Sequence, residues 1–162
     1  MVISRCSDVL RQGRPRSRDA LLSFIEVAIV SERLCEQMAF EPTGMLEYLK
    51  SRGCRIGGVT LGQRGLVWYD EAGTVQTLPA VVVPEDRVID TSGAGDVFHG
   101  AYVYSYLADA AKSWEGHFHF ARAAATHKIQ YLGNEAGLPT LADIAAIQVG
   151  KQASRTGVEW GR

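Results

Sequence analysis

The sequence predicts an α/β fold in which a mostly parallel sheet lies between helices. Three observations lead to this class. Short β-branched runs, such as residues 27–30, alternate with longer segments of helical periodicity. A glycine-rich turn at residues 90–95 joins one such run to a long apolar helix. Glycine turns also separate short strand-like segments over residues 55–78, which predicts a small β-meander.

The composition is that of an ordinary globular domain and narrows the classes of partner. The 162 residues are 46% hydrophobic and 22% charged, which suffices for one domain with its own core. A net charge of −1 favours neither nucleic acid nor an anionic membrane as a partner. No apolar run approaches the roughly 20 residues of a membrane span. Three widely spaced cysteines, Cys6, Cys35 and Cys54, form no metal or disulfide motif and favour a reducing, cytoplasmic setting.

The chain is expected to hold one domain, over residues 19–149, between two polar ends. Residues 1–18 are rich in arginine and predict a mobile segment. A basic arm for nucleic acid is the alternative, which the interspersed acids and the lack of aromatic residues disfavour. Residues 150–162 are polar without periodicity and predict a flexible tail.

The first half of this domain predicts a strand, two helices and the meander. Residues 27–30 form the strand, and Ser31 is expected to cap the helix that follows. A second helix with one apolar face is expected to end at Gly53. The strands of the meander are expected at residues 55–61, 66–69 and 74–78.

The second half predicts three helices. The first runs from Gly93 to about Ala111, the second from Phe118 to about Tyr131, and the third from Leu141 to about Val149. One face of the first helix carries Val97, Ala101, Tyr104 and Ala108. His99 lies one turn from Asp96 on this helix. A dyad with Asp96 and a hydrogen-bonded helix histidine are both open, and the second is favoured.

The stretch Asp90-Thr91-Ser92-Gly93-Ala94-Gly95-Asp96 carries the predicted chemistry. It follows β-branched residues at 81–83 and 88–89, which are expected to form a strand end, and it opens the first of these helices. Backbone amides of the Gly93–Gly95 turn can converge on an anion, whose charge the helix dipole favours. Asp96 would repel a phosphate, unless it takes a proton from a hydroxyl that attacks the phosphate. A glycine-capped helix start with an ordinary acidic residue is the alternative.

This stretch resembles the signature of the ribokinase-like (PfkB) carbohydrate kinases, Asp-Thr-x-Gly-Ala-Gly-Asp-x-Phe, at every fixed position. A second motif, Thr60-Leu61-Gly62-Gln63-Arg64-Gly65, resembles the family's Thr-x-Gly-x-x-Gly nucleotide loop. A plain hairpin turn is the alternative for the second motif alone. Ser-Glu at 31–32 and Gly-Leu-Pro-Thr at 137–140 look most like fructokinase, ketohexokinase and sulfofructose kinase members.

The resemblance implies a three-layer α/β/α fold and an ATP-dependent carbohydrate kinase that uses Mg²⁺. Asp96 would be the general base, with Gly93, Ala94 and Gly95 binding the migrating phosphoryl charge. The nucleotide would be held by Thr60, Gly62 and Gly65, and Arg122 falls near a position that touches the base in relatives. Asp90 and Ser92 are the candidates for holding a monovalent cation, K⁺ in particular.

The sequence also departs from the family. An Asn-x-x-Glu motif that helps place magnesium and phosphates is absent, because Ser31 and Leu34 stand at the matching positions. The resemblance covers roughly residues 8–148 and matches only the C-terminal half of a family member, without the sugar-binding region and the small β lid. We therefore expect an exposed strand edge, which favours a homodimer or a sheet-completing partner.

Three alternatives to a sugar kinase stay open. The chain could be a noncatalytic nucleotide-binding remnant, which keeps the ATP half and has lost the sugar site. It could be a subunit whose sheet a partner chain completes. An adenosine-type nucleoside kinase shares both motifs, so the class of acceptor depends on residues outside them.

Overall fold

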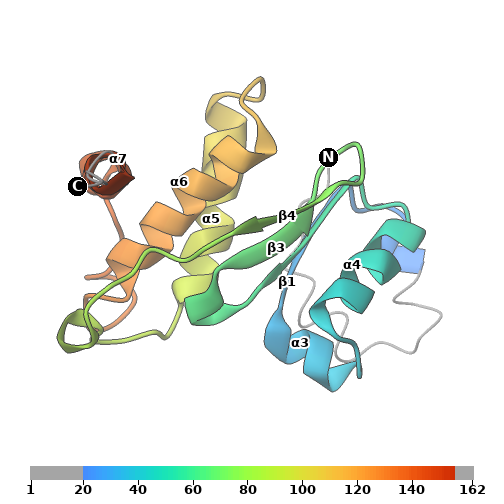
Figure 1. The fold of residues 1–162 in the computed structure, drawn as a ribbon, viewed down its shortest axis with the longest axis horizontal. Coiled ribbons are helices and arrows are strands. Elements are labelled where there is room, and N and C mark those ends of the chain that lie inside the picture. The colour runs from blue at the N-terminus through green and yellow to red at the C-terminus, as the bar shows by residue number, and fades with distance from the viewer. Residues whose placement is uncertain (1–19, 156–162) are drawn as a thin grey trace, which may run out of the picture. The chain divides into compact units, whose positions relative to one another are not determined.

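The computed structural model describes the backbone of residues 20–155 and the side chains of residues 20–149. The predicted segment 1–18 and residues 156–162 lie outside the described residues. The chain consists of two compact units, Met1–Ala80 and Val81–Arg162. Figure 1 shows their elements, and each unit is described by itself.

The first unit holds a four-stranded sheet in the order β1-β2-β3-β4. Its strands are β1 (Val27–Ser31), β2 (Ile56–Thr60), β3 (Leu66–Tyr69) and β4 (Val75–Leu78). The predicted meander is confirmed, because β2, β3 and β4 pair antiparallel in sequence order. Only β1 and β2 pair parallel, so the described sheet is mixed rather than mostly parallel. The turns after β2 and β3 are too short for the crossover that a parallel pairing needs.

Two helices follow β1 and supply this crossover, α3 (Glu32–Gln37) and α4 (Pro42–Ser51). The Ser31 hydroxyl accepts a hydrogen bond from the amide of Leu34 at 3.4 Å, which confirms the predicted cap. Both helices lie on the same side of the sheet in Figure 1. Their apolar faces form one buried core with the strands, whose members include Val30, Leu34, Met45, Leu46, Leu49, Val59 and Tyr69.

The second unit is helical. A short 3₁₀ turn (Glu85–Arg87) precedes α5 (Ala94–Ala108), α6 (Trp114–Lys128) and α7 (Leu141–Arg155). Helices α5 and α6 pack side by side through aromatic pairs, among them Phe98 with Phe118 at a ring-centroid distance of 6.2 Å. Helix α6 begins four residues before the predicted Phe118, because Ser113 caps it by accepting from the amide of Gly116 at 3.2 Å.

The predicted strand end at residues 81–83 is wrong, because the structure has no strand there. Val82 is 92% exposed, and Pro84, which has no amide hydrogen, follows at once. The backbone amides of Ile89 and Asp90 donate to the carbonyl of Ile129, at 2.8 and 3.2 Å, rather than to a neighbouring strand. This segment is therefore held by the end of α6.

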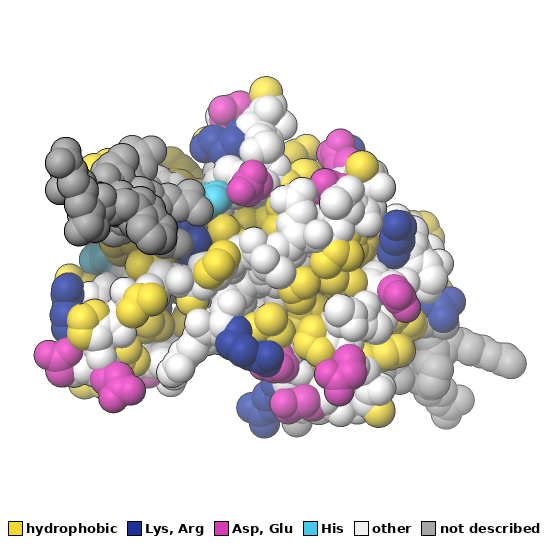
Figure 2. All heavy atoms as spheres, viewed as in Figure 1, with side chains coloured by type: hydrophobic (Ala, Val, Ile, Leu, Met, Phe, Trp, Pro, Cys, Tyr) yellow, Lys and Arg dark blue, Asp and Glu magenta, His cyan; other side chains and the backbone are white. Residues whose placement is uncertain are grey.

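Two surface findings bear on partners. Among the described residues, no helix is both long enough and apolar enough to cross a membrane. Figure 2 shows acidic and basic side chains interspersed over the visible face of the described part, without a large patch of one sign.

Candidate functional site

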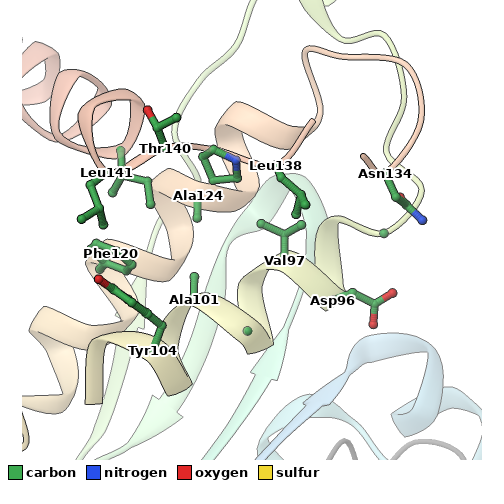
Figure 3. A pocket seen from close by; sticks show the side chains of 14 residues that line it. Asp96, Val97, Ala101, Tyr104, Phe120, Ala124, Asn134, Leu138, Thr140 and Leu141 are labelled. Carbon is green, nitrogen blue, oxygen red and sulfur yellow. The ribbon is translucent and has the colours of Figure 1, made fainter. Parts of the chain in front are cut away.

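A cavity of about 580 Å³ lies within the second unit, between α5, α6, the start of α7 and the loop that precedes α7. Figure 3 shows the side chains that line it. The lining residues are Gly93, Asp96, Val97, Gly100, Ala101, Tyr104, Phe120, Ala124, Asn134, Leu138, Pro139, Thr140, Leu141 and Ile144. The cavity has the size and the largely apolar lining of a small-molecule site.

One end of the cavity is apolar and aromatic. Tyr104 of α5 and Phe120 of α6 stack with ring centroids 5.9 Å apart and an interplanar angle of 20°. Val97 and Ala101 project from α5 into the same space in Figure 3, and Ala124 faces them from α6. The predicted helical face of α5 is thus the floor of a cavity, and small side chains at its centre leave room for a flat ligand.

The other end of the cavity is polar and coincides with the start of α5. Gly93 is the N-cap, with a left-handed φ of 74°, and a Cβ atom at this position would collide with the side chain of Asn134. Asp96 lies in the first turn, is exposed, and points away from the apolar side chains in Figure 3. The partial positive charge of a 15-residue helix therefore faces this end of the cavity.

The amides of the predicted anion-binding turn are not equivalent. The amide of Ala94 donates to the carbonyl of Thr91 at 3.2 Å and so takes part in closing the turn. The amide of Gly95 has no acceptor among the described residues, and no atom lies within 4 Å of where its Cβ would be. Gly95 is therefore the member of the turn that an anion can approach without moving the protein.

Asp90 holds the segment before α5 to the rest of the unit. Its carboxylate accepts hydrogen bonds from the amides of Ser92, at 2.8 Å, and Gly133, at 3.0 Å. The ammonium of Lys128 lies 3.1 Å from the carbonyl oxygen of Asp90 and 3.4 Å from its Oδ2. The hydrogen bonds from Ser92 contribute most, with Gly133 and Lys128 adding to them, in lowering the pKa of Asp90 to about 2. The charged carboxylate of Asp90 therefore serves to hold this segment in place.

Two other predicted side chains contact their own helices. The ring of His99 donates from Nδ1 to the carbonyl of Gly95 at 2.7 Å, with the proton assigned to that nitrogen. The guanidinium of Arg122 donates to Nδ1 of His119 at 2.8 Å. The described residues of α6 that line the cavity are Phe120 and Ala124. Arg122 does not line it.

The second motif lies in the first unit, at the turn between β2 and β3. Gly62 has a φ of 57°, and no atom lies within 4 Å of where its Cβ would be. Gly65 has a φ of 95°, and a Cβ there would collide with the carbonyl of Leu78 and lie 2.6 Å from the amide nitrogen of Ala80. Gly65 is thus required by the fold itself, whereas the open side of Gly62 is where a ligand can approach.

The polar side chains of this turn are engaged within the first unit. The Thr60 hydroxyl donates to the carbonyl of Val30 at 3.3 Å, so in this arrangement its proton is directed at β1. Arg64 forms an ion pair with Glu32, the first residue of α3. Glu32 follows β1 directly, two positions before the place where the family's Asn-x-x-Glu motif has its glutamate. Its carboxylate contacts the turn by pairing with Arg64.

The described residues contain no cluster of three or more His, Cys, Asp or Glu side chains that could hold a metal ion. Mg²⁺ that accompanies a nucleotide is held largely by phosphate oxygens and water, so it does not require such a cluster.

Sequence reasoning missed several cavity residues, above all Asn134, Leu138 and Phe120. Phe120 and Ala124 lie four residues apart on the predicted helix, but the sequence does not show that this helix face lines a cavity. Asn134 and Leu138 lie in a loop whose path no periodicity reveals. The predicted helix face that carries Val97, Ala101 and Tyr104 is the signal in the sequence that points to this cavity.

Comparisons with known proteins show the family of this chain. The profile of the pfkB family carbohydrate kinases matches residues 9–141. A ribokinase of Lactococcus lactis is 30% identical over 126 residues, which are 78% of this chain and 39% of that protein. The structure of Arabidopsis thaliana ribokinase complexed with ribose and ATP is 22% identical, with a TM-score of 0.69 over 80% of this chain and 43% of that one.

A ribokinase II structure from E. coli in complex with ATP and Mg²⁺ is 19% identical, with a TM-score of 0.70 over 84% of this chain and 43% of that one. These likenesses confirm the predicted ribokinase-like α/β fold. The chain spans about two fifths of the length of the curated relatives that it matches. With most of its length covered by the family profile, the chain belongs to the PfkB family of carbohydrate kinases.

Proposed function

We propose that this chain is the nucleotide-binding and catalytic part of an ATP-dependent carbohydrate kinase. One observation carries the proposal: a carboxylate, Asp96, stands beside the open glycine of a helix start at the polar mouth of an apolar cavity. A binding module for phosphate alone gains nothing from an acid at this place, because the two negative charges repel.

The two ends of the cavity suit the two ends of a nucleotide. A purine ring can lie in the apolar part beside Tyr104 and Phe120, since bases stack well on aromatic side chains. The phosphates then extend toward the Gly93–Gly95 turn and the positive end of α5. Thr60, Gly62 and Gly65 of the first unit stay candidates for holding the nucleotide, and Arg122 stays a candidate for contact with the base. Mg²⁺ would neutralise charge on the phosphates.

The proposed step is the transfer of one phosphoryl group to a sugar hydroxyl. Asp96 takes the hydroxyl proton as the sugar oxygen forms a bond to the γ-phosphorus, and the bond from this phosphorus to the β,γ-bridging oxygen breaks to release ADP. The Gly95 amide, and in part the rest of the Gly93–Gly95 turn, stabilises the charge that moves with the phosphoryl group.

The test compares Asp96→Asn with the unchanged chain. Calorimetry with Mg-ATP measures binding, and a coupled assay measures ADP release with a panel of ketoses, aldoses and nucleosides. We expect Asp96→Asn to keep its affinity for ATP and to lose sugar-dependent turnover by roughly 100-fold or more. Asp86→Asn, at an exposed acid of the 3₁₀ turn, is the matched control and should behave as the wild type. Unchanged turnover in Asp96→Asn would show that the base is another group.

The same assay separates the other candidate functions. Binding of Mg-ATP without turnover on any acceptor favours a noncatalytic remnant, and turnover on nucleosides alone favours a nucleoside kinase. In the described part of the sheet β1 pairs only with β2, which leaves one edge for a second copy or a partner chain. Turnover that appears only at high protein concentration would favour such an assembly. A cytoplasmic location belongs to this proposal as well.

A further inference from the structure

Lys128, the last residue of α6, is a fully buried lysine, with 0% of its surface exposed. A buried ammonium is costly unless it is paired and hydrogen-bonded. Among the described residues, the ammonium has polar contacts with Asp90, at 3.1 Å to its carbonyl oxygen and 3.4 Å to its carboxylate. Asp90 is one of the two residues, with Ser92, that the resemblance to the PfkB kinases makes candidates for holding a monovalent cation.

The loop before α7 closes over the stem of Lys128. A Cβ atom at Gly137, which is buried, would collide with Cδ of Lys128 and would lie 3.1 Å from its carbonyl oxygen. The amide of Gly133, at the other end of the loop, donates to the Asp90 carboxylate at 3.0 Å. The ammonium is thus enclosed by the groups that a bound metal cation would have to contact.

A metal cation does not fit this arrangement. The carbonyl oxygen and the Oδ2 atom of Asp90, a candidate residue for the cation, already accept from an ammonium that carries the same single positive charge. The backbone amide of Ser92, the other candidate, donates a hydrogen bond to the Asp90 carboxylate. Residues 90–92 are therefore already held in a turn without a cation. A second cation would have to displace Lys128 from a fully buried position or share one carboxylate with it.

The place of this pair explains what it does for the site. Asp90 lies three residues before Gly93, the cap of α5, and the loop that covers Lys128 also carries Asn134, whose side chain packs against Gly93. The pair therefore joins the end of α6, the start of α5 and the loop behind the anion-binding turn. A bound cation would do two things here: it would neutralise the Asp90 carboxylate, and it would hold these three segments together.

We infer that the Lys128 ammonium is a built-in replacement for a monovalent cation, which positions the Gly93–Gly95 turn without K⁺. Lys128 is a positioning residue in this role and does not touch the substrate. The inference rests on the proposed kinase function only for its effect on nucleotide binding; the replacement of the cation itself is a property of the fold.

The first arm of the test needs no variant. Thermal unfolding and the affinity for Mg-ATP are measured on the full chain in chloride salts of tetramethylammonium, Na⁺ and K⁺ at equal ionic strength. We expect equal midpoints, and affinities equal to within about twofold, because a cation that does not bind the native state cannot stabilise it. A saturable rise of the midpoint or the affinity with K⁺ would overturn the inference.

The second arm removes the charge with Lys128→Met, which keeps most of the stem. In tetramethylammonium the midpoint should fall by roughly 10 °C, because Asp90 is left without its cation. Added K⁺ should restore much of this loss and of any lost affinity. Lys50→Met, at an exposed lysine of α4, is the matched control and should show neither effect. A loss in Lys128→Met that K⁺ does not relieve indicates a packing role only and overturns the inference.

The two proposals fail separately. If the unchanged chain does not bind Mg-ATP in any salt, the kinase proposal fails, while the unfolding midpoints still decide whether a cation is needed. If Lys128→Met does not fold, the first arm alone decides.

Discussion

Two pairs of glycines show how residues of one type serve different purposes in this protein. Gly65 and Gly93 have positive φ values, and their missing side chains leave space that other parts of the same unit fill. Gly62 and Gly95 have no atom within 4 Å of where a Cβ would be. The first pair is required by its close surroundings, and the second pair leaves open the space that the proposed ligand would use.

Gly95→Ala is expected to separate stability from function. Alanine favours a helix over glycine by up to about 1 kcal/mol, and there is open space for the methyl group, so the free energy of unfolding should be unchanged or higher. The methyl group would stand beside the amide that we propose binds the phosphoryl charge, and turnover should fall at least about tenfold. Chemical denaturation and the ADP-release assay measure the two effects.

Gly44→Ala in α4, where the new Cβ would meet only Phe40 at 3.5 Å, controls for the gain in helix propensity. It should raise stability without changing turnover. If Gly95→Ala leaves turnover intact as well, the turn does not bind the phosphoryl group.

Gly65→Ala is expected to act on the fold alone. Its positive φ and the collision with the Leu78 carbonyl should lower the free energy of unfolding by roughly 1–3 kcal/mol. Gly62→Ala shares the positive φ but meets no atom, so it should cost clearly less. Urea denaturation of the two variants makes the comparison, and equal losses would contradict this distinction.

At the scale of the elements, α5 and α6 are joined by a buried polar pair. The hydroxyl of Ser105 lies 3.0 Å from Nδ1 of His117, whose ring is fully buried beside Tyr106 and Trp114. Nε2 of His117 is buried without a hydrogen-bond partner among the described residues. Burial, and to a smaller extent the ammonium of Lys112, lowers the pKa of His117, against a smaller opposite effect of Asp109.

This lowered pKa predicts a loss of stability in mild acid. Below the ordinary histidine pKa of about 6.5 the unfolded chain binds a proton that the folded chain resists. The free energy of unfolding should therefore fall as the pH decreases through and below this value, by at most about 1.4 kcal/mol per pH unit from this residue. Chemical denaturation at several pH values between about 8 and 5, a range that brackets the ordinary histidine pKa, measures how the free energy of unfolding changes with pH.

His117→Gln should flatten that slope, whatever it does to stability at pH 8. His127→Gln, at a half-buried histidine of the same helix that stacks on Tyr131, is the matched control and should retain the slope. An unchanged slope in His117→Gln would assign the acid sensitivity to other groups.

At the scale of the whole molecule, the family and the α/β class could be predicted because their signals are local. The signature at residues 90–98 and the loop at 60–65 are contiguous, and each meander strand is bounded by its own glycine turn. The strand expected at residues 81–83 failed, because β-branched residues form a strand only where another strand pairs with them. The strand directions of the sheet likewise depended on the lengths of connections rather than on composition.

The sequence alone determined the glycine turn, the helix that it opens, the carboxylate in its first turn and the family to which they belong. Each is set by neighbouring residues, through backbone freedom and helical spacing. Only the tertiary structure decided that Tyr104 and Phe120 form one wall, that Asn134 packs against Gly93, and that Lys128 pairs with Asp90 across 38 positions. A lysine is expected to lie in solvent unless it has a partner of opposite charge. Here the partner is distant in the sequence, so only the packing of the two segments reveals it.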